Sequence, residues 1–308
     1  MSVERDGRKS EFSAASTRET LTNACRAVEL NPAGATLMRL GENAVFALPE
    51  ESIVVRIARS MHSYDDVQKE MRVARWLLQE GFPAVRLADV PGSDAPLIVD
   101  EHPVSFWRQI KVGSGSPSSA DLGRLLRWLH GLDVPEALEL PPFDPFAKVE
   151  RRLRNAPAMV DAEEIRLLAT LHDRLRCELA ALDFGFPPSA VHGDAHPGNL
   201  LYTDSGEVVL LDFEAFCYGP REWDLSLTGA YRHGFNWLDE AKYAEFVRAY
   251  GFDVSRWNGF SVLRSIRELG MTTWLMQLVD RDPKFEAEFS QRIADLLTGE
   301  MPRQWRPF

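Results

Sequence analysis

The segment VHGDAHPGNLLY (residues 191–202) places two histidines, an aspartate and an asparagine between apolar ends. A chain reversal needs Gly, Pro, Asp or Asn, but it does not need this set in this order. The apolar stretch EVVLLDFEAF (207–216) follows and carries a further aspartate, Asp212. Asp194, Asn199 and Asp212 are groups that phosphoryl transfer uses: one carboxylate orients the attacking hydroxyl, while an amide oxygen and a second carboxylate hold Mg²⁺ on nucleotide phosphates.

The stretch 207–216 is expected to be a β-strand, in which side chains alternate between two faces. Asp212 and Glu214 are two residues apart, so both would point the same way and could reach one metal ion. With Asn199 on the preceding loop, this pattern predicts a Mg²⁺ site made of oxygen ligands. The alternative is a turn rich in Pro and Gly whose polar residues have no chemical role.

Strands that could position these groups are expected in the first third of the chain. Runs rich in Val, Ile, Leu and Phe occupy 35–40, 44–48 and 52–58, and the short breaks between them favour antiparallel hairpins. Two further runs, PLIVDE (96–101) and PVSFWRQIKV (103–112), also read as strands.

A helix is expected between these groups of strands, from Tyr64 to Glu80, because apolar residues recur there at the spacing of a buried stripe. Glu70 falls beside that stripe. A buried carboxylate without a partner is costly, so Glu70 should have a cationic neighbour. The residues of the stripe are Val67, Met71, Ala74 and Leu78.

A segment rich in Gly and Ser, GSGSPSS (113–119), separates this β-rich part from a mainly helical remainder. The sequence therefore predicts an N-lobe of residues 1–106, of which 1–15 form a loose arm. A hinge of 107–116 and a helical C-lobe of 117–308 follow. A cleft between unequal lobes is a common place for a small-molecule site.

Composition and charge limit the class of protein. The 308 residues suit about two domains, and the net charge of −11 disfavours nucleic acid or an anionic membrane as a partner. Cys25, Cys177 and Cys217 are odd in number and widely spaced, which argues against a disulfide framework or a zinc site. Because neither an apolar run of about 18 residues nor a signal peptide is found, a cytoplasmic protein without a membrane span is expected.

The ordered set H-G-D-x-H-P-G-N followed by L-D-F-E resembles the catalytic segment of the aminoglycoside phosphotransferase family. It is also similar to the choline-kinase-like and methylthioribose-kinase-like small-molecule kinases and, more distantly, to protein kinases, whose catalytic-loop Asp and Asn have the spacing of Asp194 and Asn199. The resemblance implies Asp194 as the catalytic base and Asn199 as a metal ligand. It makes Asp212 the principal Mg²⁺ ligand and Glu214 a secondary one.

The resemblance also implies supporting residues around the loop. His192 and His196 would shape it rather than react. The segment YGPREWDLSL (218–227) is similar to the family's G-D-P-x-x-D-L-A, so Asp224 would buttress the catalytic loop. The sequence departs from the pattern at Pro220-Arg221, where the family has Asp-Pro.

Nucleotide-binding residues are implied in the first third. Arg56 stands on the strand where kinases carry a phosphate-binding lysine, and Glu70 on the helix that carries the lysine's ion-pair partner. Arginine is a planar fork that binds phosphate bidentately, and some members of the small-molecule kinase family have Arg there. The alternative is a strand arginine paired with any nearby acid.

Two segments would contact the nucleotide base. LGENAVFAL, which contains Asn43, would cover the nucleotide, although it reads equally well as a hairpin turn. The hinge region, with Trp107, Gln109 and Ile110, would bind adenine through its backbone and sandwich the ring, although aromatic residues in strands usually pack in the core.

Acceptor-binding residues are implied on a late helix of the second lobe. Glu268 and Trp274 are the candidates within RSIRELGMTTWLMQLVDRD. The alternative is an amphipathic core helix whose polar residues face solvent.

The implied fold is α+β, a two-lobed protein-kinase-like fold with an antiparallel-sheet N-lobe and a mainly helical C-lobe. The implied activity is transfer of the γ-phosphoryl group of ATP or GTP, with Mg²⁺, to a hydroxyl of an aminoglycoside, amino sugar or related natural product. The alternatives are a metabolite kinase for an amino alcohol or sugar, and a nucleotide-binding pseudoenzyme scaffold. Retention of Asp194, Asn199 and Asp212 argues against a scaffold, which needs no base.

Overall fold

The computed structural model describes residues 12–299 and 301–307. Contacts divide the chain into two compact units. The first unit contains the chain up to Gly115 together with 136–139 and 201–214, and the second contains the rest. The first is built on an antiparallel sheet and the second is mainly helical, so the expected α+β class is confirmed.

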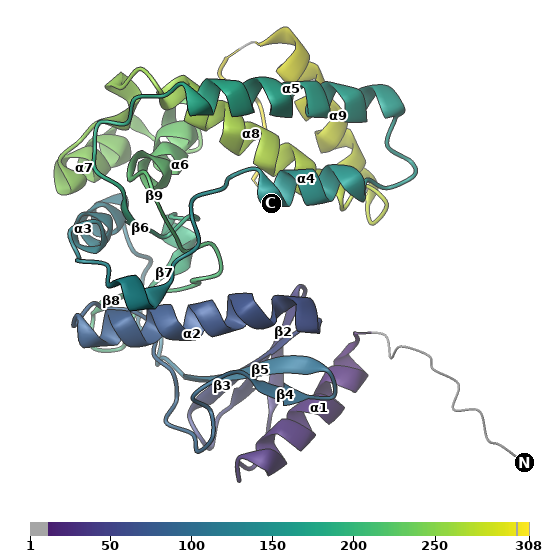
Figure 1. The fold of residues 1–308 in the computed structure, drawn as a ribbon, viewed down its shortest axis with the longest axis vertical. Coiled ribbons are helices and arrows are strands. Elements are labelled where there is room, and N and C mark those ends of the chain that lie inside the picture. The colour runs from purple at the N-terminus through teal and green to yellow at the C-terminus, as the bar shows by residue number, and fades with distance from the viewer. Residues whose placement is uncertain (1–11, 300, 308) are drawn as a thin grey trace, which may run out of the picture. The chain divides into compact units, whose positions relative to one another are not determined.

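The sheet of the first unit has five strands in the order β1-β2-β3-β5-β4 (Figure 1). Its strands are β1 (Thr36–Leu40), β2 (Asn43–Leu48), β3 (Ile53–Ala58), β4 (Leu97–Val99) and β5 (His102–Arg108). Alternation along β3 sends Val55 and Ile57 into one core cluster, while Arg56 and Ala58 point to the other face. Arg56 therefore leaves the sheet on the face opposite the main apolar core.

A helix packs on each face of this sheet. The helices are α1 (Ala14–Ala27) and α2 (Tyr64–Gln79). Leu21 and Cys25 of α1 join the cluster of Val55, whereas Val67 and Met71 of α2 pack with the opposite face. Alternation and helix placement together bring α2 over Arg56.

Two details of these helices differ from the sequence expectation. Ser13 forms a capping box with Ser16, so α1 begins inside the segment expected to be a loose arm, whose residues 1–11 lie outside the described residues. In α2 the stripe holds for three positions, but Leu78 is 49% exposed and Leu77 is buried instead.

A hairpin from late in the sequence completes the first unit. It consists of β7 (Leu200–Tyr202) and β8 (Val208–Leu210). Leu210 N–H donates to the carbonyl of Pro83 at 3.0 Å, and Gly113 N–H donates to that of Tyr202 at 2.8 Å. The expectation that everything from 117 onward forms one lobe therefore fails for 201–214, which these backbone bonds hold to the first unit.

The second unit is a helical assembly with one small two-stranded sheet (Figure 1). The helix α8 (Phe260–Met276) packs against α4, α5, α6 and α9, and buries Leu263, Ile266 and Leu269. The other helices are α3 (Ser119–Leu129), α4 (Ala147–Arg154), α5 (Ala162–Ala180), α6 (Glu222–His233), α7 (Glu240–Tyr250) and α9 (Pro283–Thr298). The strands are β6 (Ser189–Val191) and β9 (Cys217–Gly219). Within 12–299 and 301–307, no helix has the length and apolar character needed to cross a membrane.

Helices α3 and α7 approach each other most closely at Gly123. A Cβ atom placed there would lie 2.7 Å from the carbonyl oxygen of Phe246 and 3.0 Å from the Cβ of Ala249. Backbone cannot yield as a flexible side chain can, so this crossing requires glycine.

We expect Gly123→Ala to lower the free energy of unfolding by about 1–3 kcal/mol, because it overpacks this crossing. The matched control is Gly270→Ala in α8, where a Cβ would meet nothing within 4 Å. That change should be neutral or stabilising by up to about 1 kcal/mol. Urea unfolding of both variants tests the contrast, and equal midpoints would contradict it.

Candidate active site

The loop between β6 and β7 carries the predicted catalytic residues. Gly193 has φ +87°, and a Cβ there would lie 2.2 Å from the carbonyl oxygen of Ala215, so only glycine fits. A 3₁₀ turn over Pro197–Asn199 ends the loop, capped by His196, whose Nδ1 accepts from Gly198 N–H at 3.1 Å. The expected shaping role of His196 corresponds to this cap.

Asp224, at the start of α6, holds the first half of this loop. Its carboxylate accepts hydrogen bonds from the backbone N–H of His192 and of Gly193, each at 2.8 Å. It also hydrogen-bonds Nε2 of His130 at 3.1 Å. Burial raises the pKa of Asp224, but His130 and His192 outweigh it and hold the pKa below its ordinary value. Asp224 thus has the buttressing contacts expected from the sequence.

Arg267 of α8 is a second support that sequence reasoning did not select. Its guanidinium donates to the carbonyl of Gly193 and to that of Trp223, both at 2.9 Å, and lies 3.6 Å from the centroid of the Trp223 ring. Burial lowers the pKa of Arg267 to about 10, although Asp194 and Asp224 oppose that shift. The sequence signal was a charged residue within an apolar helix, but its partners lie far along the chain.

Asp194 presents its carboxylate at the end of this supported backbone. Its side chain is 56% exposed, and its backbone N–H donates to Nδ1 of His192 at 3.3 Å. Partial burial raises the pKa of Asp194, but His196, Arg267 and His192 lower it further, so the net pKa lies well below the ordinary value. Asp194 is therefore an ionised and accessible hydrogen-bond acceptor.

Asn199 is fixed by the same loop. Its side-chain NH₂ donates to the carbonyl of Asp194 at 2.9 Å, and its backbone N–H donates to that of His196 at 2.9 Å. Because the NH₂ group is used in this bond, the amide oxygen is the atom that Asn199 can offer to a cation.

The first unit contains the expected ion pair of Arg56 and Glu70. Arg56 donates to the Glu70 carboxylate at 2.6 Å, and the two side chains are 22% and 4% exposed. The guanidinium also lies 5.9 Å from the centroid of the Trp107 ring. The pairing expected from a buried helix carboxylate is therefore present.

Acidic groups outnumber bases around this pair. Burial raises the pKa of Glu70; Arg56 opposes the rise, whereas Asp212 and Glu214 reinforce it. The same carboxylates raise the pKa of Arg56 despite its burial. Lys69 donates to the backbone carbonyl of Glu214 at 2.5 Å. Glu70, Asp212 and Glu214 therefore all act on the Arg56 guanidinium.

Asp212 does not lie in a strand, so the expectation of a strand over 207–216 is wrong. Strand β8 ends at Leu210, and Asp212 has φ +61°. Its Oδ1 accepts from Glu214 N–H at 3.3 Å, a local turn that aspartate forms readily because its short side chain can satisfy the backbone. Turn geometry, not strand alternation, orients Asp212 and Glu214.

The residues expected to contact the nucleotide base lie in the sheet and its continuation. Asn43 begins β2, and its carbonyl closes the hairpin by accepting from Gly41 N–H at 3.0 Å. Trp107 is 3% exposed and its ring Nε1 donates to Ser105 Oγ at 2.9 Å, which makes it a core residue and contradicts a sandwiching role. Gln109 uses its N–H on the carbonyl of Ser52, at 2.9 Å. Ile110 is half-buried.

The two residues predicted to bind the acceptor, Glu268 and Trp274, differ in exposure. Glu268 is 1% exposed and forms ion pairs with Arg264 at 3.2 Å and Arg303 at 3.1 Å. A carboxylate neutralised in the core cannot bind an acceptor, so that expectation is wrong. Trp274 is 38% exposed, and its acceptor role stays a prediction.

The types of side chain present limit which metal ion could bind. Among the residues that the structure describes, no group of three or more His, Cys, Asp or Glu side chains is arranged to hold a metal ion. Mg²⁺ usually takes only one or two protein carboxylates and completes its shell with water and substrate phosphates. Asp212, Glu214 and the amide oxygen of Asn199 fit that requirement in chemistry.

Fold and loop define a phosphotransferase with a protein-kinase-like fold. The chain belongs to the phosphotransferase enzyme family (APH), whose family model matches residues 41–260. This confirms the resemblance seen in the sequence and the expected enzyme class, a phosphotransferase with an alcohol group as acceptor.

Solved structures share the fold. The amicoumacin kinase hAmiN, in complex with AMP-PNP, Ca²⁺ and Ami, matches with a TM-score of 0.70 at 15% identity, over 95% of this chain and 97% of that one. Spectinomycin phosphotransferase APH(9)-Ia, in complex with ADP and spectinomycin, gives 0.64 at 15% identity, over 92% and 95%. A choline/ethanolamine kinase family protein from Mesorhizobium loti gives 0.59 at 20% identity, over 92% and 96%.

One curated relative is similar over a short segment. Protein ACTIVITY OF BC1 COMPLEX KINASE 3, chloroplastic, from Arabidopsis thaliana, is 30% identical over 89 residues, which are 29% of this chain and 12% of that protein.

We expect Arg56→Met to lower the free energy of unfolding by about 3–5 kcal/mol near neutral pH, because it leaves Glu70 buried and charged. In this variant the folded-state pKa of Glu70 lies above its unfolded value. The penalty is therefore present above the folded pKa and disappears as pH falls to the unfolded pKa, about 4.3.

The double variant Arg56→Met/Glu70→Gln is the control, because it removes the charge that causes the penalty. It should recover much of the lost stability and lose the pH dependence. Urea unfolding at several pH values measures both effects. Additive losses in the two single variants would mean that the residues act independently.

Proposed function

We propose that this enzyme transfers the γ-phosphoryl group of ATP or GTP to a hydroxyl of an aminoglycoside, an amino sugar or a related natural product. The observation that carries the proposal is Asp194, an exposed and ionised carboxylate on a backbone fixed by Asp224 and Arg267. A solvent-facing loop needs no such support, whereas a reacting group must be held within a fraction of an ångström.

The lowered pKa of Asp194 suits this chemistry. Phosphoryl transfer passes through a loose transition state in which the attacking oxygen needs placement more than early deprotonation. An ionised Asp194 accepts the hydrogen bond of the acceptor hydroxyl and directs its lone pair toward phosphorus. It takes the proton late, when the new P–O bond has made that oxygen acidic.

The metal of this proposal is Mg²⁺, held by Asp212, Glu214 and Asn199. When bound with nucleotide, it neutralises charge on the phosphate oxygens. The carboxylates of Asp212 and Glu214, which act on both Arg56 and Glu70, support a cation there, because Mg²⁺ prefers oxygen ligands of this kind. Arg56, held by Glu70, contributes a fixed positive charge toward the nucleotide phosphates.

The net charge of the protein and the shared fold support a nucleotide as phosphate donor and an amino sugar as acceptor. The hAmiN structure contains AMP-PNP, and that of APH(9)-Ia contains ADP with spectinomycin. A net charge of −11 suits a cationic acceptor such as an amino sugar. A metabolite kinase for an amino alcohol is the second candidate, supported by the fold shared with the Mesorhizobium loti protein. A cytoplasmic location, where nucleotide is available, belongs to the proposal.

The test is phosphate transfer from ATP and from GTP to a panel of aminoglycosides, other natural products with hydroxyl groups, sugars and amino alcohols. We expect turnover with at least one amino sugar compound. Turnover with amino alcohols alone would replace the first candidate by the second. Nucleotide binding without turnover on the whole panel would favour a scaffold.

We expect Asp194→Asn to bind nucleotide normally and to lower kcat by about 10²-fold or more, the usual size of a general-base contribution. The amide keeps the shape and removes the negative charge that orients the hydroxyl. Steady-state kinetics and nucleotide calorimetry on the same preparation separate the two effects. Near-normal kcat in the folded variant would remove Asp194 from the mechanism.

Asp212 and Glu214 should differ as metal ligands. We expect Asp212→Ala to abolish the enhancement of nucleotide affinity by Mg²⁺, whereas Glu214→Ala should retain an enhancement weakened by about 10–100-fold, as for an outer-shell partner. Calorimetry with and without Mg²⁺ measures both. The reverse order would exchange the roles of the two carboxylates.

A further inference from the structure

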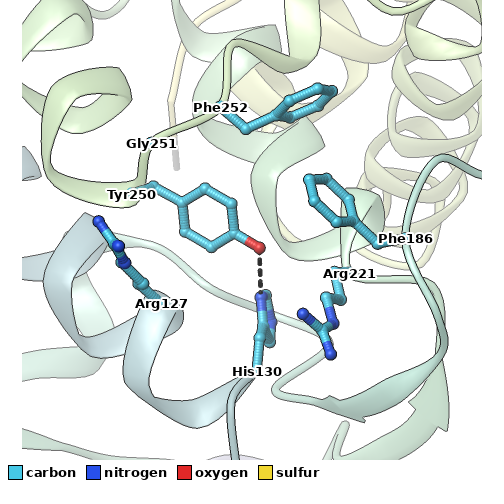
Figure 2. A pocket seen from close by; sticks show the side chains of 7 residues that line it. All are labelled: Arg127, His130, Phe186, Arg221, Tyr250, Gly251 and Phe252. Carbon is cyan, nitrogen blue, oxygen red and sulfur yellow. Dashed lines mark hydrogen bonds between the residues drawn. The ribbon is translucent and has the colours of Figure 1, made fainter.

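The second unit contains a cavity of about 310 Å³ that the proposed reaction does not use. It lies where α3, α6 and α7 end or begin, and Figure 2 shows the side chains that line it. Its polar lining comes from Arg127, Arg221, His130 and Tyr250. A volume near 300 Å³ is at the lower end of the range for small-molecule pockets.

The two arginines supply cationic groups without acidic partners. Arg127 is exposed, and neither it nor Arg221 forms an ion pair with any residue in 12–299 or 301–307. The Nε of Arg221 is buried and has no hydrogen-bond partner in that part of the chain. Such a donor is costly to bury, so an acceptor should reach it from the cavity.

Two acids lie behind the cavity. One oxygen of Glu222 accepts from the N–H groups of Gly185 and Phe186, at 2.7 and 3.2 Å. Its other oxygen is buried and has no hydrogen-bond partner among the described residues. The carboxylate of Asp224 accepts the loop hydrogen bonds described above.

Two phenylalanine rings lie on the side of the cavity where Arg221 is found (Figure 2). The rings of Phe186 and Phe252 meet edge to face, with centroids 4.9 Å apart and planes at 83°. Arg221 lies over the Phe186 ring at 5.9 Å, which helps to orient its guanidinium. A flat apolar group would find ring faces next to hydrogen-bond donors here.

We propose that this cavity binds a small organic anion with one aromatic ring, whose carboxylate or phosphate pairs with Arg221, while Arg127 on the other side of Tyr250 adds positive charge. The planar fork of arginine matches either group, and the two phenylalanine rings pack against the ring of the anion. The proposal is independent of the reaction, because it requires neither nucleotide nor acceptor.

The cavity touches the hydrogen-bond chain that supports the catalytic loop. The hydroxyl of Tyr250 lies 2.9 Å from Nδ1 of His130 (Figure 2), and Nε2 of His130 lies 3.1 Å from Asp224. Asp224 in turn holds His192 and Gly193. An occupant that contacts Tyr250 and His130 therefore stiffens this chain and slows opening of the loop backbone.

The experiment is calorimetric titration of the full chain with four probes. Benzoate and phenyl phosphate combine the ring with the charge, inorganic phosphate has only the charge, and benzamide has only the ring. We expect saturable binding of at least one ring-bearing anion, and weaker binding of both partial probes. A protein of net charge −11 repels anions in general, so saturable binding requires a local site.

Three variants locate the binding. Arg221→Gln removes a charge-assisted hydrogen bond and should weaken binding of the ring-bearing anion about tenfold or more, whereas Arg127→Ala removes a nearby positive charge and should weaken it less. Arg248→Ala is the matched control, because Arg248 is an exposed arginine on α7 outside the cavity lining. Arg127 is exposed, so its variant should fold even if that of Arg221 does not.

Hydrogen exchange of the His192 and Gly193 amides tests the connection to the loop, and we expect slower exchange in the bound protein. The proposal is overturned if neither ring-bearing anion binds, or if neither Arg221→Gln nor Arg127→Ala binds it more weakly than Arg248→Ala. Unchanged exchange at saturation would overturn the connection to the loop.

Discussion

The loop that carries Asp194 depends on the hydrogen bonds that the carboxylate of Asp224 accepts. This carboxylate is fully buried and accepts from two successive backbone N–H groups, so it fixes the loop where Gly193 turns through a left-handed conformation. Arg267 binds the other polar backbone group of the same glycine, because its guanidinium donates a hydrogen bond to the carbonyl of Gly193. A carboxylate thus binds the N–H groups of the loop and a guanidinium binds one of its carbonyls. These bonds fix the backbone next to Asp194.

In the first unit, the electrostatic interactions centre on Arg56. On the face of the sheet opposite the main core, Arg56 pairs with Glu70, and the carboxylates of Asp212 and Glu214 also act on its guanidinium. Such a site is unfavourable alone, because like charges repel at short range. In the proposed reaction, a divalent cation and the nucleotide phosphates would bind here together, and each would supply the charge that the other lacks.

The sequence predicted those features that depend on local patterns of residues. The strands, the helix over α2 and the pair of Arg56 with Glu70 follow from alternation, periodicity and the cost of a buried charge. Prediction from the sequence failed for residues whose role depends on partners far away along the chain. Glu268 became a core ion pair through Arg303, which is 35 residues away along the chain. His130 and Arg267 were not selected, because their partners belong to other elements and leave no mark in local spacing.

The hairpin of residues 201–214 has a consequence for synthesis of the protein. The first unit is not a continuous stretch of chain, since this hairpin is added to it only after residues 116–135 and 140–200 of the second unit have been made. During translation, the nascent sheet would leave the ribosome with backbone groups at Pro83 and Gly113 still waiting for their partners. The N-terminal unit therefore cannot finish folding first, and Asp212 and Glu214 join Glu70 only after the loop that carries Asp194 has also been made.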